Sequence, residues 1–257
     1  MEAIFWKIVA LAVIGYLLAC LALYLKQRSF LYYPTERVDH PLRVEIFENQ
    51  GERVEVIVIN EGKENAALYF GGNAEIVAYH GVELRDKLPD VSVYLVNYRG
   101  YGGSSGSPSE SALLDDALFI YDRIIEWHNS VDIVGRSLGS GVAIHVASLR
   151  PVEKMVLITP YDSIRAIGQS LYPIFPIGLI LKDHFDSASR VDKVDARTLV
   201  VLAEDDRVIP LKSSERLIAK FSDDLVRTVT IKGASHNDVT DTDLYYELLN
   251  KFLAGKL

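Results

Sequence analysis

The chain has 257 residues, a length that suits one α/β domain with a short appendage. It holds 35 Asp and Glu residues against 27 Lys and Arg residues, which gives a formal net charge of −8. This balance argues against nucleic-acid binding, which needs a basic patch for the phosphates. The single cysteine, Cys20, lies in an apolar N-terminal run, so the rest of the chain has no disulfide, thiolate metal site or cysteine nucleophile.

The apolar run extends from Ile8 to Leu25 and contains no charged residue. About 18 apolar residues are enough for a helix to enter the hydrocarbon core of a bilayer. Lys7 precedes the run and Lys26 follows it, and no polar face interrupts it. The sequence therefore predicts a membrane anchor over residues 1–28.

Two further features of this segment concern its processing and its orientation. A lipoprotein-like box ends at Cys20, but residues 21–25 continue the apolar run past it, which fits an uncleaved anchor better. More positive residues follow the run than precede it, namely Lys26, Arg28, Arg37 and Arg43. The positive-inside rule then favours a cytoplasmic position for the domain that follows.

After a connector at residues 29–42, strand-like and helix-like segments alternate through residues 43–257. Residues 53–60 alternate as an edge or antiparallel strand does, and five short apolar segments are typical of buried parallel strands: 66–70, 91–97, 131–134, 155–159 and 198–203. Helices are expected at 74–87, 110–127, 137–149, 213–221 and 241–253. The pattern predicts an α/β fold with a doubly wound, mostly parallel sheet. Residues 161–190, rich in apolar side chains and prolines, are expected to form a small cap over it.

A G-x-S-x-G motif places a candidate nucleophile at Ser137. The motif covers residues 135–139, follows the strand-like segment VDIV and opens a helical segment. This strand–turn–helix context is the one that a nucleophile elbow requires, where the serine hydroxyl projects above the sheet. A serine hydroxyl is a weak nucleophile until a base removes its proton.

The base should be a histidine that follows the last strand of the sheet. Of the six histidines, His236 alone has this position, after the strand-like segment VRTVTIK. The others are expected to lie in a helix, directly after one, in the cap or in the connector: His80, His145, His128, His184 and His40. The imidazole needs an acid to hold its tautomer. Residues 204–206 are all acidic and follow a strand, so the pattern leaves this choice open, with Asp162 as a lesser candidate.

The chain resembles the α/β-hydrolase superfamily, in particular membrane-anchored bud-emergence-type hydrolases and their bacterial relatives. The motifs that carry the resemblance run in family order: FLYYP from 30, FGGNAE from 70, NYRGYGGSSGSPSE from 97, GRSLGSG from 135, DRVIP from 206 and GASHND from 233. The resemblance assigns the triad acid to Asp206, because the family's acid precedes an x-hydrophobic-hydrophobic-Pro sequence.

The oxyanion formed in such a reaction needs preorganised N–H donors. Leu138, the residue after the nucleophile, is expected to supply one, and the resemblance assigns the other to Asn73. Relatives commonly have His-Gly-Asn at this loop, where this chain has Gly-Gly-Asn at 71–73. They usually have Asp at the position of Asn97, which we interpret as structural.

The sequence thus predicts a serine hydrolase that cleaves carboxylic ester or thioester bonds through an acyl-enzyme on Ser137. No cofactor is expected, and no cluster of residues has metal-ligand spacing. The apolar cap favours an acyl or lipid-like substrate, although its side chains could instead only pack the cap onto the sheet. Two alternatives remain: a serine peptidase or amidase with the same triad, and a catalytically silent, membrane-tethered binding protein.

Overall fold

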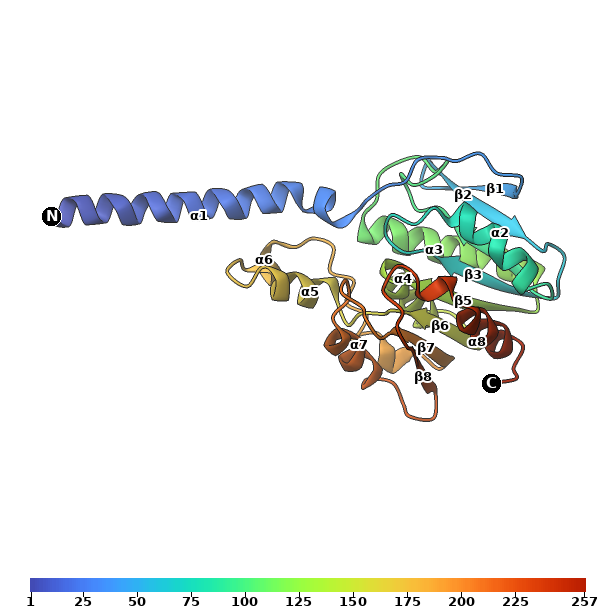
Figure 1. Ribbon diagram of the computed structural model, residues 1–257. Helices are drawn as coiled ribbons and strands as arrows, with labels where there is room; N and C mark the ends of the chain where they lie inside the picture. The colour runs from blue at the N-terminus through green and yellow to red at the C-terminus, as the bar shows by residue number, and fades with distance from the viewer.

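A computed structural model describes all 257 residues and shows a long N-terminal helix beside an α/β domain (Figure 1). The domain is built on one eight-stranded sheet in the order β1-β2-β4-β3-β5-β6-β7-β8. Strand β2 pairs in the antiparallel sense with β1 and β4, and all other pairs are parallel. The strands are β1 (Arg43–Asn49), β2 (Glu52–Ile59), β3 (Asn65–Phe70), β4 (Ser92–Val96), β5 (Ser130–Arg136), β6 (Lys154–Ile158), β7 (Arg197–Ala203) and β8 (Val226–Ile231).

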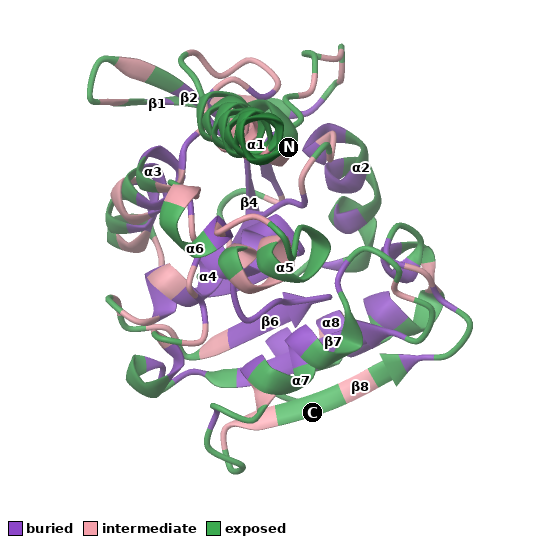
Figure 2. Ribbon diagram, turned by 90° about the vertical axis from the view of Figure 1, so that its left-hand side faces the viewer, coloured by how far each residue is buried: buried purple, intermediate pink, exposed green.

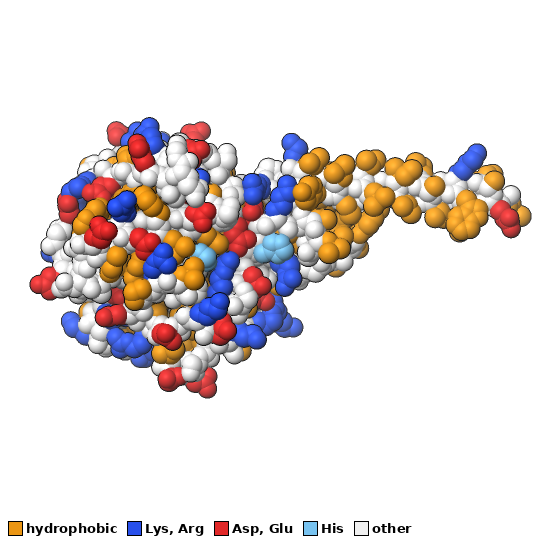
Figure 3. Space-filling view, turned by 180° about the vertical axis from the view of Figure 1, so that it is seen from behind, with side chains coloured by type: hydrophobic (Ala, Val, Ile, Leu, Met, Phe, Trp, Pro, Cys, Tyr) orange, Lys and Arg blue, Asp and Glu red, His pale blue; other side chains and the backbone are white.

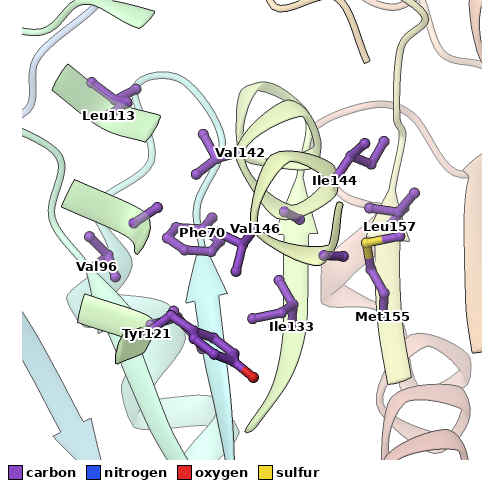
Figure 4. Packing of buried hydrophobic residues seen from close by; sticks show 14 of the residues in the cluster. Phe70, Val96, Leu113, Tyr121, Ile133, Val142, Ile144, Val146, Met155 and Leu157 are labelled. Atoms are coloured by element: carbon purple, nitrogen blue, oxygen red, sulfur yellow. The ribbon is translucent and has the colours of Figure 1, made fainter. Parts of the chain in front are cut away.

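Helices cover both faces of this sheet, which makes it doubly wound as the sequence predicted. The helices of the domain are α2 (Val77–Lys87), α3 (Glu110–Ile124), α4 (Leu138–Ala147), α7 (Leu211–Ile218) and α8 (Asp243–Leu253), with short 3₁₀ turns at η1 (Ile125–Trp127), η2 (Val191–Lys193) and η3 (Val239–Asp241). Successive side chains of a strand point to opposite faces, so Ile133 joins the core beneath α3 and α4 while Val134 joins the core beneath α2 and α8. Figure 4 shows the first of these cores around Phe70, Ile133 and Val142.

Most of the predicted elements are present, with a few differences at their bounds. Strand β1 was not predicted, because only Phe47 within it is buried and its pattern is weak. Helix α2 begins at Val77 rather than at residue 74, where Ala74 has a positive φ of 61°. The N-terminal helix α1 (Glu2–Leu31) continues through the first three residues of the expected connector.

Residues 161–190 form a layer over the carboxyl ends of the strands, where the cap was expected. This layer contains α5 (Ile164–Leu171) and the single turn α6 (Ile177–Ile180). Pro173 and Pro176 separate the two helices, because proline has no N–H to continue the hydrogen-bond ladder. Figure 2 looks along α1 and shows α6 and α5 below it in the view, with α6 joined to α1 through Gln27 and Ile180.

Candidate active site

Three of the predicted site residues meet at the carboxyl edge of the sheet. Ser137 stands between β5 and α4, Asp206 follows β7 and His236 follows β8. Nε2 of His236 lies 2.9 Å from Oγ of Ser137, and Nδ1 lies 2.8 Å from Oδ2 of Asp206. The imidazole can therefore accept the serine proton on one side while the carboxylate holds its other nitrogen.

The turn at Ser137 has the strained geometry of a nucleophile elbow. Its φ of 48° and ψ of −115° are rarely populated by a residue with a side chain, and such strain is maintained only where the surroundings enforce it. A Cβ at Gly139 would overlap the carbonyl oxygen of Phe70, so only glycine lets α4 approach β3 this closely. The turn thus holds the serine at the start of α4, facing His236.

Of the four candidate acids, only Asp206 contacts His236. Glu204 instead accepts the N–H of Gly233 at 2.8 Å. The second oxygen of Asp206, Oδ1, accepts hydrogen bonds of 2.8 Å from the backbone N–H groups of Val208 and Ile209, which fix the carboxylate. No hydrogen bond joins Asp205 to the imidazole, although both line the same open pocket. Asp162 instead pairs with Arg216 at 2.6 Å and accepts from Ser213. Burial would raise the pKa of Asp162, but these partners hold it below its ordinary value.

The two expected oxyanion donors lie beside Ser137, in the lining of the same cavity. The N–H of Leu138 is the first of α4, where N–H groups have no intrahelical acceptor. The backbone N–H of Asn73 donates to no protein acceptor, whereas its side chain makes three hydrogen bonds. The Asn73 amide donates to the carbonyl of Leu31 at 2.6 Å and accepts from the Tyr101 hydroxyl at 2.7 Å. The side chain therefore ties this loop to the end of α1 and leaves the backbone donor free.

Asn97, the other departure from the family pattern, has no contact with the three site residues. It is buried at the end of β4, and its amide donates to Glu55 at 3.1 Å. The neighbouring Gly103 N–H donates to the same carboxylate oxygen at 3.0 Å. Asn97 thus holds the turn after β4, in agreement with a structural role.

A buried ion pair beneath the site was not singled out from the sequence. Arg136 and Glu75 approach to 2.9 Å, and their side chains are only 12% and 8% exposed. Glu75 accepts the N–H of Gly72 at 2.7 Å, next to Asn73. Arg136 donates to the backbone carbonyl of His236 at 3.2 Å and to that of Asn237 at 3.1 Å. The pair therefore joins the loop of Asn73 to the loop that holds His236.

The electrostatics of this pair favour its ionised form. Burial alone would raise the pKa of Glu75, but the charge of Arg136 and the hydrogen bonds from Gly72 and Tyr69 hold it below its ordinary value. Since the folded-state pKa of Glu75 is lower than that of the unfolded chain, the pair stabilises the fold at neutral pH. This contribution is lost as the pH falls through the folded-state pKa of Glu75.

Removing one partner of this pair is expected to destabilise the protein strongly. Arg136→Met leaves Glu75 buried and unpaired, which should lower the free energy of unfolding by about 3–5 kcal/mol. The His236 loop also loses two donors, so kcat/KM should fall by up to about 10²-fold, as misplacement of a catalytic group does. Urea unfolding and ester hydrolysis measure the two effects.

Two variants control this experiment. Arg227→Met removes an exposed arginine of β8 that makes no ion pair, and it should change stability by less than about 0.5 kcal/mol. Arg136→Met combined with Glu75→Gln leaves no unpaired charge and should recover part of the lost stability. A loss in Arg136→Met no larger than that in Arg227→Met would show that the pair does not hold the two loops.

Two cavities meet at the site. The larger, of about 590 Å³, is lined by 19 residues of which 15 are hydrophobic, and Ser137 and Leu138 lie in its wall. The smaller, of about 430 Å³, is lined mainly by polar residues, among them His236, Asn237 and Arg207. A substrate whose scissile bond lies at Ser137 could therefore place an apolar group in the larger cavity and a polar group in the smaller one. No group of three or more His, Cys, Asp or Glu side chains is arranged to hold a metal ion.

Comparison with known proteins finds relatives of this chain by sequence. No protein-family model matches the chain. An uncharacterized protein of Mycobacterium tuberculosis is 35% identical over 207 residues, which cover 75% of this chain and 70% of that protein. The lysophosphatidylserine lipase ABHD12 of Bos taurus is 31% identical over 173 residues, but the match covers 58% of this chain and only 44% of that protein.

The solved structures agree on the fold. The structure of Est1E from Butyrivibrio proteoclasticus matches with a TM-score of 0.68 at 15% identity, over 83% of this chain and 98% of that one. An α/β-hydrolase fold protein from Chitinophaga pinensis matches with a TM-score of 0.63 at 13% identity, over 83% and 98%. The narrower resemblance to bud-emergence-type hydrolases is not tested by these matches and stays a prediction. The chain has the α/β-hydrolase fold and belongs to one family with the mycobacterial protein, and the ABHD12-type lipases are more distant relatives.

Proposed function

We propose that the protein is a membrane-anchored serine esterase or thioesterase that acts on substrates with an apolar acyl chain. The observation that carries this proposal is the position of Ser137 in the wall of an apolar cavity, within hydrogen-bond distance of His236. The name of the relative ABHD12, a lysophosphatidylserine lipase, supports a lipid-like substrate.

In the proposed reaction, His236 takes the proton of Ser137 as the serine oxygen attacks the carbonyl carbon. Asp206 holds the imidazole in the required tautomer and stabilises the imidazolium. The N–H groups of Leu138 and Asn73 hold the negative oxygen of the tetrahedral intermediate. His236 then gives the proton to the leaving alcohol or thiol, and an acyl-enzyme remains on Ser137. A water molecule, activated by His236, attacks the acyl-enzyme and releases the acid.

The two cavities suggest how the substrate is oriented. The leaving group must be near His236, because this residue protonates it, and His236 borders the polar cavity. The acyl chain then occupies the apolar cavity on the other side of the bond. This arrangement favours an amphiphilic ester over a peptide, because a peptide would place polar amide groups in the apolar cavity.

The proposed membrane anchor is α1. It is the one helix in the structure long and apolar enough to cross a membrane, with a mean hydropathy of 2.6 and no buried residue. Hydrophobic side chains cover its protruding surface (Figure 3). An uncleaved anchor and a signal sequence both fit these properties, and we favour the anchor because α1 packs on the cap.

A series of nitrophenyl esters from acetate to decanoate tests the proposed substrate class. Each added methylene should gain up to about 0.8 kcal/mol of binding until the cavity is full. This corresponds to about a fourfold rise in kcat/KM per carbon, where the contact persists in the transition state. A flat profile, or a preference for acetate, would contradict an acyl-binding role of the cavity. Faster turnover of the matched nitroanilides would favour the peptidase alternative.

A further inference from the structure

Helix α1 contributes directly to the wall of the apolar cavity. Leu23, Gln27, Phe30 and Leu31 line the same cavity as Ser137. The opposite wall comes from the cap, including Ile164, Leu171 and Ile177 of α5 and α6. The cavity thus lies between the helix that enters the membrane and the cap, rather than within the hydrolase domain alone.

Hydrogen bonds fasten the cap to α1 at two levels. Near the domain, the Gln27 amide donates to the carbonyl of Ile180 at 2.9 Å and accepts the N–H of Lys182 at 2.5 Å. Arg28 pairs with Asp183 at 2.8 Å, beside these bonds. Farther along α1, the Tyr16 hydroxyl donates to the carbonyl of Ile174 at 2.9 Å.

An aromatic contact accompanies the outer hydrogen bond. The rings of Tyr16 and Phe175 stack with centroids 5.8 Å apart. Tyr16 lies ten residues before Lys26, a distance of about 15 Å along a helix axis. If α1 spans a bilayer with Lys26 at the interface, the cap tip at Ile174 and Phe175 lies at the depth of the hydrocarbon chains.

The composition of the cap agrees with this depth. Between residues 164 and 181 the only charged residue is Arg165, in the first turn of α5, whose backbone N–H donates to the carbonyl of His184. Of the next charges, Asp183 pairs with Arg28 of α1, and the Lys182 ammonium lies over the Tyr24 ring, 4.1 Å from its centroid. The side chains at the tip are exposed although apolar: Ile174 is 72% and Leu179 is 86% exposed. Such a surface is costly in water and suits a lipid phase.

We propose that the cap tip inserts into the bilayer beside α1, and that a membrane-resident acyl lipid enters the cavity laterally between the two. This proposal rests on the proposed esterase function for its substrate. It makes α1 part of the substrate-binding site as well as an anchor. The acyl chain would then reach Ser137 without passing through water.

Insertion can be measured without any enzymatic activity. In the full chain with Cys20→Ser, Leu179→Cys is labelled with an environment-sensitive fluorophore and reconstituted into phosphatidylcholine vesicles. We expect a blue-shifted emission that is quenched by lipids brominated in the middle of their chains. Leu149→Cys, at a 50% exposed leucine beyond the far end of α4, is the matched control. The fluorophore at this position should show the emission typical of water. Emission typical of water at residue 179 would overturn the insertion.

The proposed lateral route between α1 and the cap is tested with a substitution that narrows it. Leu23→Trp fills the α1 wall of the cavity, whereas Leu25→Trp changes a 66% exposed residue of the same helix that does not line it. With a long-chain ester embedded in vesicles, Leu23→Trp should lower the rate at least about tenfold and Leu25→Trp should leave it unchanged. Leu25→Trp should also hydrolyse soluble nitrophenyl acetate as the parent does. The ratio of embedded-ester to acetate turnover should fall in Leu23→Trp and stay unchanged in Leu25→Trp.

The outcomes separate this inference from the proposed function. Equal rates of Leu23→Trp and Leu25→Trp on the embedded ester, with an active parent, would overturn the lateral route alone. A parent that hydrolyses neither ester would overturn the esterase function, while the fluorescence measurement would still decide the insertion. Resistance of every variant to carbonate extraction shows that the anchor itself is unaffected.

Discussion

Ser137→Ala is expected to reduce ester hydrolysis by on the order of 10⁶-fold in kcat. The variant keeps the elbow, the oxyanion donors and both cavities, and it loses only the oxygen that would form the acyl-enzyme. His236 would then have no hydroxyl to deprotonate. Steady-state kinetics with a nitrophenyl ester measure the loss, and the thermal midpoint should stay close to that of the parent.

The control for this variant must separate loss of the nucleophile from damage to the turn. Ser137→Cys keeps a nucleophilic atom at the same place, so it should retain covalent acylation even if turnover falls. Ester hydrolysis by Ser137→Ala at a rate near that of the parent would rule out an acyl-enzyme on this residue. The catalytically silent alternative predicts instead that neither variant differs from the parent.

Asp206→Asn is expected to lower kcat by about 10⁴-fold with little change in structure. The amide would place a donor against Nδ1 of His236, where the carboxylate now accepts at 2.8 Å. The imidazole would then turn to the tautomer that carries its proton on Nε2, which cannot accept the serine proton. The backbone bonds from Val208 and Ile209 can still be made to the amide oxygen, so the loop should keep its conformation.

Asp205 provides a matched control one residue away. It has the same charge and lies in the same loop, but it makes no hydrogen bond to His236. Asp205→Asn should change kcat by less than about threefold, since exposed substitutions away from the reacting groups have small effects. If Asp205→Asn and Asp206→Asn lost activity equally, the effect would come from the charge of the loop and not from orientation of the histidine.

Local sequence patterns predicted most of the elements of the fold. The strand–turn–helix around Ser137 and the late histidine both follow from sequence order, because parallel strands bring their carboxyl ends to one edge of the sheet. Strand β1 escaped prediction because its partner β2 supplies the hydrogen bonds while its own side chains stay mostly exposed. An edge strand of this kind has little hydrophobic periodicity to detect.

The contacts that were not predicted join residues far apart in the chain. Glu75 and Arg136 stand 61 positions apart. Each lies in a motif that predicted a different site residue, Asn73 in the first and Ser137 in the second. The charged residue at the second position of the G-x-S-x-G motif was the available signal, because that turn is expected to be buried and a buried charge needs a partner. Tyr16 and Ile174 are 158 positions apart, and no local pattern predicts that α1 packs on the cap.

Covalent labelling tests the central claim of a Ser137 nucleophile most directly. The intact protein is incubated with a fluorophosphonate, which reacts with an activated serine, and its mass is then measured before and after proteolysis. The proposed mechanism predicts one adduct per chain, located on Ser137, and none on Ser137→Ala. Asp206→Asn should react far more slowly than Asp205→Asn. Equal labelling of the parent and Ser137→Ala, or an adduct on another serine, would contradict it.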